Sequence, residues 1–96
     1  MDKQVNEQQL IDLGAESETL LQTPVFNSTI NGLVEACFQA FINTKPEQEA
    51  EREKTYHHYR ALVDIISTLK QRVEVKNNIE KEREENQSDK RKKNEE

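Results

Sequence analysis

The chain has 96 residues, of which 34% are charged and 32% hydrophobic, and its formal net charge is −5. It has no Trp, two Gly and two Pro, so it lacks the turn residues that an all-β sandwich or barrel needs about every 8–12 residues. Its Glu, Gln, Lys, Arg and Leu content favours an all-α fold. So short a chain can hardly enclose a deep, water-free active site, so an enzyme is not expected.

Charges and large apolar residues are unevenly distributed along the chain. Residues 1–19 have a net charge of −4, residues 20–79 are neutral, and residues 80–96 have a net charge of −1. The middle segment holds 18 of the 22 Leu, Ile, Val and Phe residues. We therefore predict a flexible acidic arm over 1–16, a helical domain over 17–78 and a charged, partly disordered tail over 79–96.

The N-terminal segment contains a small apolar cluster, Leu10, Ile11 and Leu13, followed by Gly14. We interpret Gly14 as the residue that stops a short helix at its C-terminal end. The cluster also suggests a short motif that folds when it binds a partner. A second short helix, over 17–22, is predicted to end before Pro24, because the residue preceding a proline disfavours the helical conformation.

The first long helix is predicted over 24–43, with Thr23 as its N-cap and Pro24 at its first position. Its apolar face is broader than a coiled-coil seam. Gly32 weakens this helix and is a place where another backbone could come close. The face consists of Phe26, Ile30, Val34, Leu33, Cys37, Phe38, Phe41 and Ile42.

The second long helix is predicted over 46–78, after a capping box formed by Thr44 and Glu47. Its apolar residues follow the heptad spacing of a coiled coil. The apolar pattern ends there, because Lys76 and Glu80 occupy the next positions, and the helix is expected to fray by about residue 85. The heptad residues are Tyr59, Leu62, Ile66, Leu69 and Val73, flanked by Tyr56, Val63 and Ile65.

The apolar parts of these two helices have matched lengths of about 25 Å. Joined by a short turn, they predict an antiparallel two-helix hairpin with a short N-terminal helix. A hairpin of this size is marginally stable alone, so its excess apolar face is expected to be covered, above all by further copies of the chain. The N-terminal segment or another protein are the alternatives. The predicted self-association or partner interface comprises Phe26, Ile30, Val34, Phe38, Phe41, Tyr56, Tyr59, Leu62, Ile66, Leu69 and Val73.

No catalytic, cofactor-binding or metal-binding residues are predicted. His57 and His58 point about 100° apart on a helix, and His57 with Glu53 gives two ligands where zinc needs three or four. Cys37 lies in the apolar face and is interpreted as a small buried hydrophobe. Because no run of about 18 apolar residues occurs and no apolar segment follows the N-terminal residues 1–4, neither a transmembrane helix nor a signal peptide is expected.

Part of the sequence resembles small helical proteins that tailed bacteriophages encode, often near their head genes. The resemblance covers about residues 19–75, and it implies a compact helical hairpin in a virus-particle or particle-assembly setting. It implies no particular binding residues. The similar positions are Leu20–Asn27, a helix ending near Asn43 and Thr44, then Ala50–Lys54, Tyr56, Arg60–Leu62, Ile66, Leu69 and Val73.

These observations lead to a hypothesis and two rivals. The first is a non-enzymatic, homo-oligomeric virion component or head-assembly protein that contacts capsid, portal or other virion proteins, in the particle or the bacterial cytoplasm. The second is a small inhibitor or adaptor that binds a host protein through its apolar helix face and acidic arm. Nucleic-acid binding through Lys90–Lys93 is disfavoured, because the chain has no basic excess.

Overall fold

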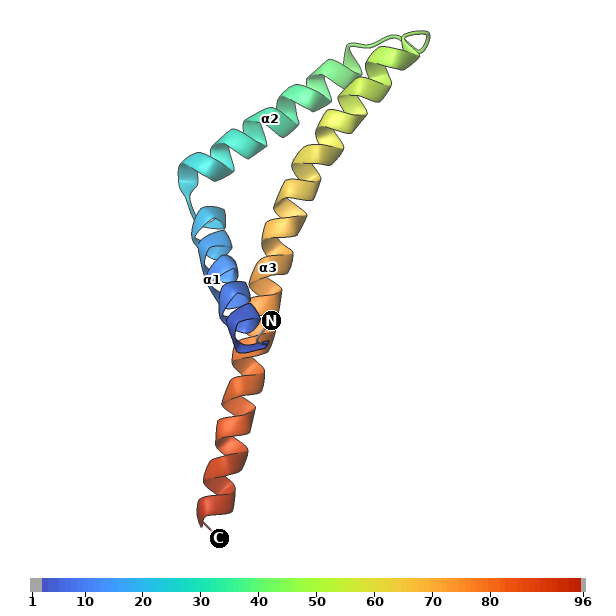
Figure 1. The fold of residues 1–96 in the computed structure, drawn as a ribbon. Coiled ribbons are helices and arrows are strands. Elements are labelled where there is room, and N and C mark those ends of the chain that lie inside the picture. Colours follow the sequence, from blue (N-terminus) through green and yellow to red (C-terminus); the bar gives the residue numbers. More distant parts are fainter. Residues whose placement is uncertain (1–2, 96) are drawn as a thin grey trace. The chain divides into compact units, whose positions relative to one another are not determined.

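The computed structural model describes residues 3–95, with side chains described for residues 6–88. Over this range it contains three α-helices and no strand: α1 (Lys3–Leu21), α2 (Pro24–Ile42) and α3 (Glu49–Glu95) (Figure 1). The all-α prediction is thereby confirmed. The chain divides into two compact units, one of Met1–Thr19 with Leu69–Glu96 and one of Leu20–Thr68. The long helix α3 belongs to both.

In the first unit, α1 packs antiparallel to the second part of α3. Glu7, near the start of α1, pairs with Arg83 at 3.2 Å, and Glu18, near its end, pairs with Lys76 at 3.2 Å. The order of these two pairs shows that the helices run in opposite directions. The chain is helical from Lys3 onward, whereas a flexible arm is predicted over 1–16.

Gly14 explains how closely α1 and α3 approach. A Cβ atom at this position would lie 2.5 Å from Cβ of Lys76 and 2.7 Å from the carbonyl oxygen of Arg72. Neither the backbone oxygen nor a Cβ atom can move aside easily, so only glycine fits here. The interpretation of Gly14 as a helix stop is wrong, because it lies buried in the middle of α1 and its φ angle is not positive.

The contact between α1 and α3 continues beyond the apolar part of the heptad pattern. Lys76 follows Val73 at heptad spacing, is half-buried, and lies within 4.0 Å of Glu80 as well as close to Glu18. Helix α3 extends to Glu95, whereas the sequence predicted fraying by about residue 85. Ion pairs of Glu18 with Lys76 and of Glu7 with Arg83 accompany the helix contact in this region.

In the second unit, α2 and the first part of α3 are connected by a loop over residues 43–48 (Figure 1). Thr23 has the extended backbone of an N-cap residue and Pro24 begins the helix, as predicted. The Asn27 side chain donates a hydrogen bond of 2.7 Å from Nδ2 to the carbonyl oxygen of Leu21. This bond satisfies a carbonyl at the end of α1 that has no partner within the helix.

The loop differs from the predicted capping box. Thr44 Oγ1 donates back to the Phe41 carbonyl oxygen at 2.6 Å, and the Lys45 backbone N–H donates to Gln48 Oε1 at 2.7 Å. The predicted capping box of Thr44 and Glu47 is therefore not formed, and Gln48 accepts the backbone hydrogen bond from Lys45 instead. Helix α3 begins at Glu49, whereas the sequence predicted a start at residue 46.

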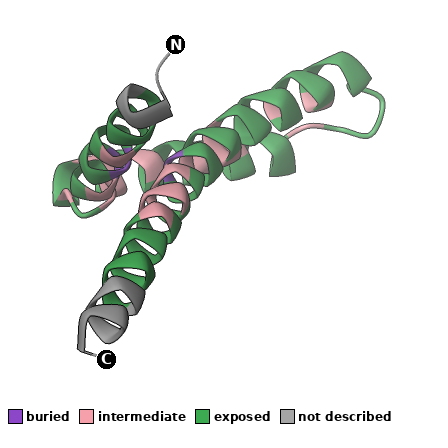
Figure 2. Cartoon of the chain, turned by 60° about the horizontal axis from the view of Figure 1, so that its bottom comes forward, coloured by how far each residue is buried: buried purple, intermediate pink, exposed green. Residues whose placement is uncertain are grey.

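Both units lack an extensive core. Among the side chains that the structure describes, the buried residues are Gly14, Ser17 and Leu69, and α2 has none (Figure 2). Leu69 is the buried large apolar residue, and Ser17 donates from Oγ to the Leu13 carbonyl oxygen at 2.8 Å. The apolar residues of α2 therefore remain largely in contact with solvent.

Candidate self-association surface

The composition of α2 makes its exposure notable. Of its 19 residues, one, Glu35, is charged. A helix with so few charges is normally buried on most of its circumference. Here no residue of α2 is buried, and Val25 is 73% exposed. Within its own unit, the helix thus presents an apolar surface that the first part of α3 does not cover.

A groove lies between α2 and the first part of α3, with a volume of about 530 Å³. Its walls contain four aromatic rings, two from each helix, and the most exposed are Phe38 at 56% and Tyr56 at 54%. Groups of this size bury well against another apolar surface. The groove is lined by Val34, Glu35, Cys37, Phe38, Phe41, Thr55, Tyr56 and Tyr59.

The spacing of these residues explains why they share one groove. Val34, Phe38 and Phe41 follow one another at intervals of four and three, so they lie on one face of α2. Tyr56 and Tyr59 are three residues apart on α3, and they meet the same groove. The groove is therefore built from one apolar face of each helix.

Arg52 does not line the groove but lies beside it, against Phe41 near the loop. Its guanidinium carbon is 4.6 Å from the centre of the Phe41 ring, which is a cation–π contact. Glu35 lines the groove nearer the start of α2 and accepts a hydrogen bond of 3.0 Å from Gln39 Nε2. The groove thus has a basic residue near one end and an acidic residue towards the other.

The structure groups the predicted interface residues unevenly. Five of them, Val34, Phe38, Phe41, Tyr56 and Tyr59, line the groove. Four others in the same unit are half-buried without lining it, namely Phe26, Ile30, Leu62 and Ile66. The last two, Leu69 and Val73, belong to the unit that contains α1.

Sequence reasoning did not include Arg52 or Glu35 in the interface. A usable signal was present for Arg52, because it lies one heptad before Tyr59 and so occupies the same face of α3. For Glu35 the signal was that it is the one charged residue in the sequence of α2. Cys37, expected to be buried, is half-buried and lines the groove.

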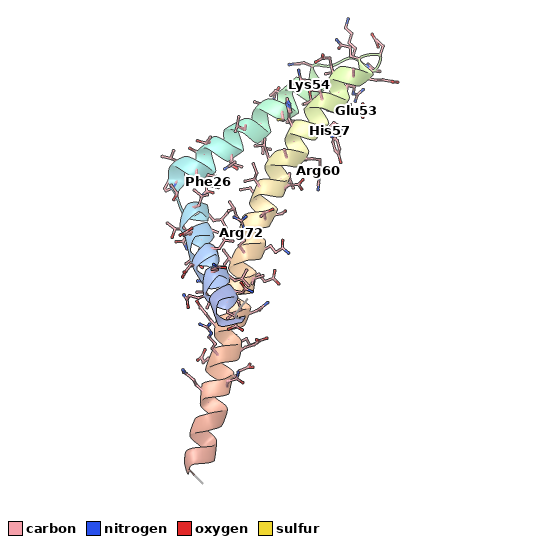
Figure 3. All side chains as sticks on the ribbon, viewed as in Figure 1. Phe26, Glu53, Lys54, His57, Arg60 and Arg72 are labelled. Carbon is pink, nitrogen blue, oxygen red and sulfur yellow. The ribbon has the colours of Figure 1, made fainter. Side chains whose placement is uncertain are left out.

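The histidines do not form part of a metal site in the described residues. His57 Nε2 lies 3.8 Å from Glu53 Oε1, and both side chains are mostly exposed (Figure 3). No group of three or more His, Cys, Asp or Glu residues with metal-binding geometry occurs in the part of the chain that the structure describes. The basic residues Lys90–Lys93 lie outside the residues whose side chains are described.

None of the described helices is both long enough and apolar enough to cross a membrane. Comparison with protein-family models, with curated proteins and with solved structures gives no significant match for this chain. Any functional conclusion therefore depends on the surface described above.

Proposed function

We propose that the protein is a non-enzymatic helical assembly protein that functions as a homo-oligomer. The observation that supports this is α2, a 19-residue helix with one charged residue and no buried residue. Solvent exposure of such a helix is costly, since about 25 cal/mol is lost for every Å² of apolar surface left in water. Association with further copies removes that cost.

The small buried core supports the same proposal. Among the side chains that the structure describes, Leu69 is the one large apolar residue that is buried. A fold of this size with so small a core needs an additional source of stability, which association with further copies supplies.

Within this proposal, α2 and the first part of α3 act as an antiparallel hairpin that is the associating element. The exposed aromatic rings of Phe38 and Tyr56 supply its contact surface. Two hairpins that pack through these faces make a four-helix bundle, a common arrangement for short helices with one apolar face.

The setting we propose is the tailed-bacteriophage particle, as a virion-associated or head-assembly component. This part rests on the resemblance over residues 19–75. Its partners would be capsid, portal or other virion proteins, and its location the virion or the host cytoplasm. The host-inhibitor alternative relied on an acidic arm over 1–16, and it loses support because Glu7 of that arm pairs with Arg83 of α3.

The molar mass of the purified chain, measured by light scattering after gel filtration at several concentrations, tests the proposed function. We expect a dimer or larger assembly that dissociates on dilution. A folded monomer of 11.2 kDa at every concentration would contradict self-assembly and favour a protein partner for α2. Quantification of the chain in purified phage particles then tests the virion setting, since a structural component is present in many copies.

A further inference from the structure

We propose that the apolar face around the groove between α2 and the first part of α3 is covered by the same face of a second copy, related by a twofold axis. This inference rests on the proposed function and adds its geometry. In an isologous contact, one patch meets itself, so the patch must be self-complementary in shape and charge. The groove meets the charge requirement.

Two charged residues lie on opposite sides of the centre of the groove: Glu35 lines it, and Arg52 lies beside it, against the lining ring of Phe41. Arg52 lies over Phe41 at the loop end, and Glu35 lies nearly two turns earlier on α2. A twofold axis through the middle of the groove, near Phe38 and Tyr56, exchanges its two ends. Each Glu35 then reaches the level of Arg52 in the other copy.

Neither of these residues has an ion pair within the part of the chain that the structure describes. By contrast, Glu7 and Glu18 of α1 both form ion pairs with basic residues of α3. Glu35 in the groove and Arg52 beside it thus keep opposite charges available around a mainly apolar surface. Two such pairs, formed symmetrically, set the direction in which two copies meet.

The aromatic rings supply the contact area between these two pairs. Phe38 is 56% exposed and Tyr56 is 54% exposed, and both line the groove. Facing copies bury these four rings in the centre, while the Tyr56 hydroxyl groups have room to reach water at the edge. The arrangement resembles the general pattern of interfaces, with apolar rings at the centre and charged residues around them.

Charge reversal, combined with mixing, tests this geometry. We expect Glu35→Lys alone and Arg52→Glu alone each to raise the dissociation constant of the assembly by about tenfold or more, because each homodimer then has two like-charge pairs. A 1:1 mixture of the two variants should assemble almost as tightly as the unmodified chain. In the mixed dimer the two introduced side chains, a lysine and a glutamate, face each other, and the remaining native Glu35 faces the remaining native Arg52. Both pairs are then attractive.

Rescue by mixing distinguishes pairing between copies from pairing within one chain. The double variant Glu35→Lys with Arg52→Glu should also recover assembly, because it too has two attractive pairs. Lys54→Glu is the matched control, since it reverses an exposed cation of α3 that, unlike Arg52, is not in contact with an aromatic ring of the groove. The dissociation constant of the Lys54→Glu assembly should stay within about threefold of that of the unmodified chain. A charge at the edge of an interface changes the affinity by no more than this amount.

The rate at which the native Cys37 thiol reacts with a reagent gives a second measurement, which is made on the unmodified chain. Cys37 lines the groove and is half-buried, so its reaction with a thiol reagent should slow as the concentration rises through the dissociation constant. If either single variant loses its helical circular-dichroism signal, the concentration dependence of Cys37 labelling in the unmodified chain decides the proposal. Labelling that is independent of concentration, in a chain that does assemble, would overturn it.

The outcomes separate this inference from the proposed function. If the unmodified chain is a monomer, self-assembly itself fails, and the groove proposal fails with it. If the chain assembles but neither variant weakens it, or mixing does not restore it, assembly stands and the twofold groove contact is refuted.

Discussion

Lys76 Nζ lies 3.2 Å from Glu18 Oε2, and the stem of the same lysine passes directly beside Gly14 of α1. The lysine side chain is 14% exposed and the glutamate side chain 40%. Lys76 therefore contributes its aliphatic stem to packing and its ammonium group to an ion pair, as long basic side chains do. The first unit is thus joined by close backbone approach and charge, with Leu69 as its buried apolar residue.

A double-mutant cycle on Glu18 and Lys76 measures the interaction free energy between these two side chains. We expect Glu18→Gln and Lys76→Gln to show a coupling free energy of about 0.5–1 kcal/mol in denaturant unfolding, because the lysine is largely shielded from water. The cycle on Glu7 and Arg83, whose side chains are 48% and 45% exposed, should give a few tenths of a kcal/mol. Equal coupling in both cycles would show that shielding of Lys76 has no energetic effect.

The two glycines of the chain form a matched pair for testing helix approach. Gly14→Ala should destabilise the chain by about 1–3 kcal/mol, because its Cβ would overlap Lys76 and the Arg72 backbone. Gly32→Ala should stabilise it by about 0.5–1 kcal/mol, because nothing lies within 4 Å of a Cβ there and alanine favours helix. Thermal unfolding followed by circular dichroism measures both.

The opposite result at Gly32 would be informative. A loss of stability or of assembly in Gly32→Ala would mean that a second copy approaches the backbone of α2 at this position. That outcome would place the contact between copies on another face of α2, away from the groove.

The helical class and the long helices could be predicted from local patterns. Pro24 fixed the start of α2, and the heptad run from Tyr59 to Val73 lies within α3, because both signals act over one or two turns. The position of α1 could not be predicted in this way. Its residues contact a part of α3 that lies far along the chain, through Glu18 with Lys76 and Glu7 with Arg83.

Gly14 shows why the local interpretation was wrong. Glycine is common both at helix ends and where helices approach closely, and sequence alone does not separate these uses. The apolar residues Leu10 and Leu13 in the same part of α1 are 42% and 37% exposed, so they do not form a strongly hydrophobic contact around Gly14. The aromatic residues of the groove could be predicted from their spacing. The proposed role of Glu35 could not, because it depends on the position of Glu35 relative to Arg52 in the folded chain.

Asn27 gives a prediction about the connection between α1 and α2. Asn27→Ala removes the hydrogen bond to the Leu21 carbonyl oxygen, so we expect a loss of about 1 kcal/mol in unfolding free energy. Ser28→Ala is the control, because Ser28 is exposed and donates to the Val25 carbonyl oxygen within its own helix. Urea unfolding at fixed protein concentration compares the two, and equal effects would mean that the Asn27 bond does not stabilise the chain.

Phe38 provides the most direct test of the exposed face of α2. Phe38→Asp should raise the dissociation constant of the assembly by about a hundredfold, because an unpaired carboxylate would have to be buried in the centre of the contact. Val25→Asp is the matched control on the same helix, since Val25 is 73% exposed and does not line the groove. Helicity by circular dichroism should be retained in both variants, because both positions are exposed within a single copy. Light scattering that gives the same molar mass for Phe38→Asp, Val25→Asp and the unmodified chain would show that the groove face takes no part in association.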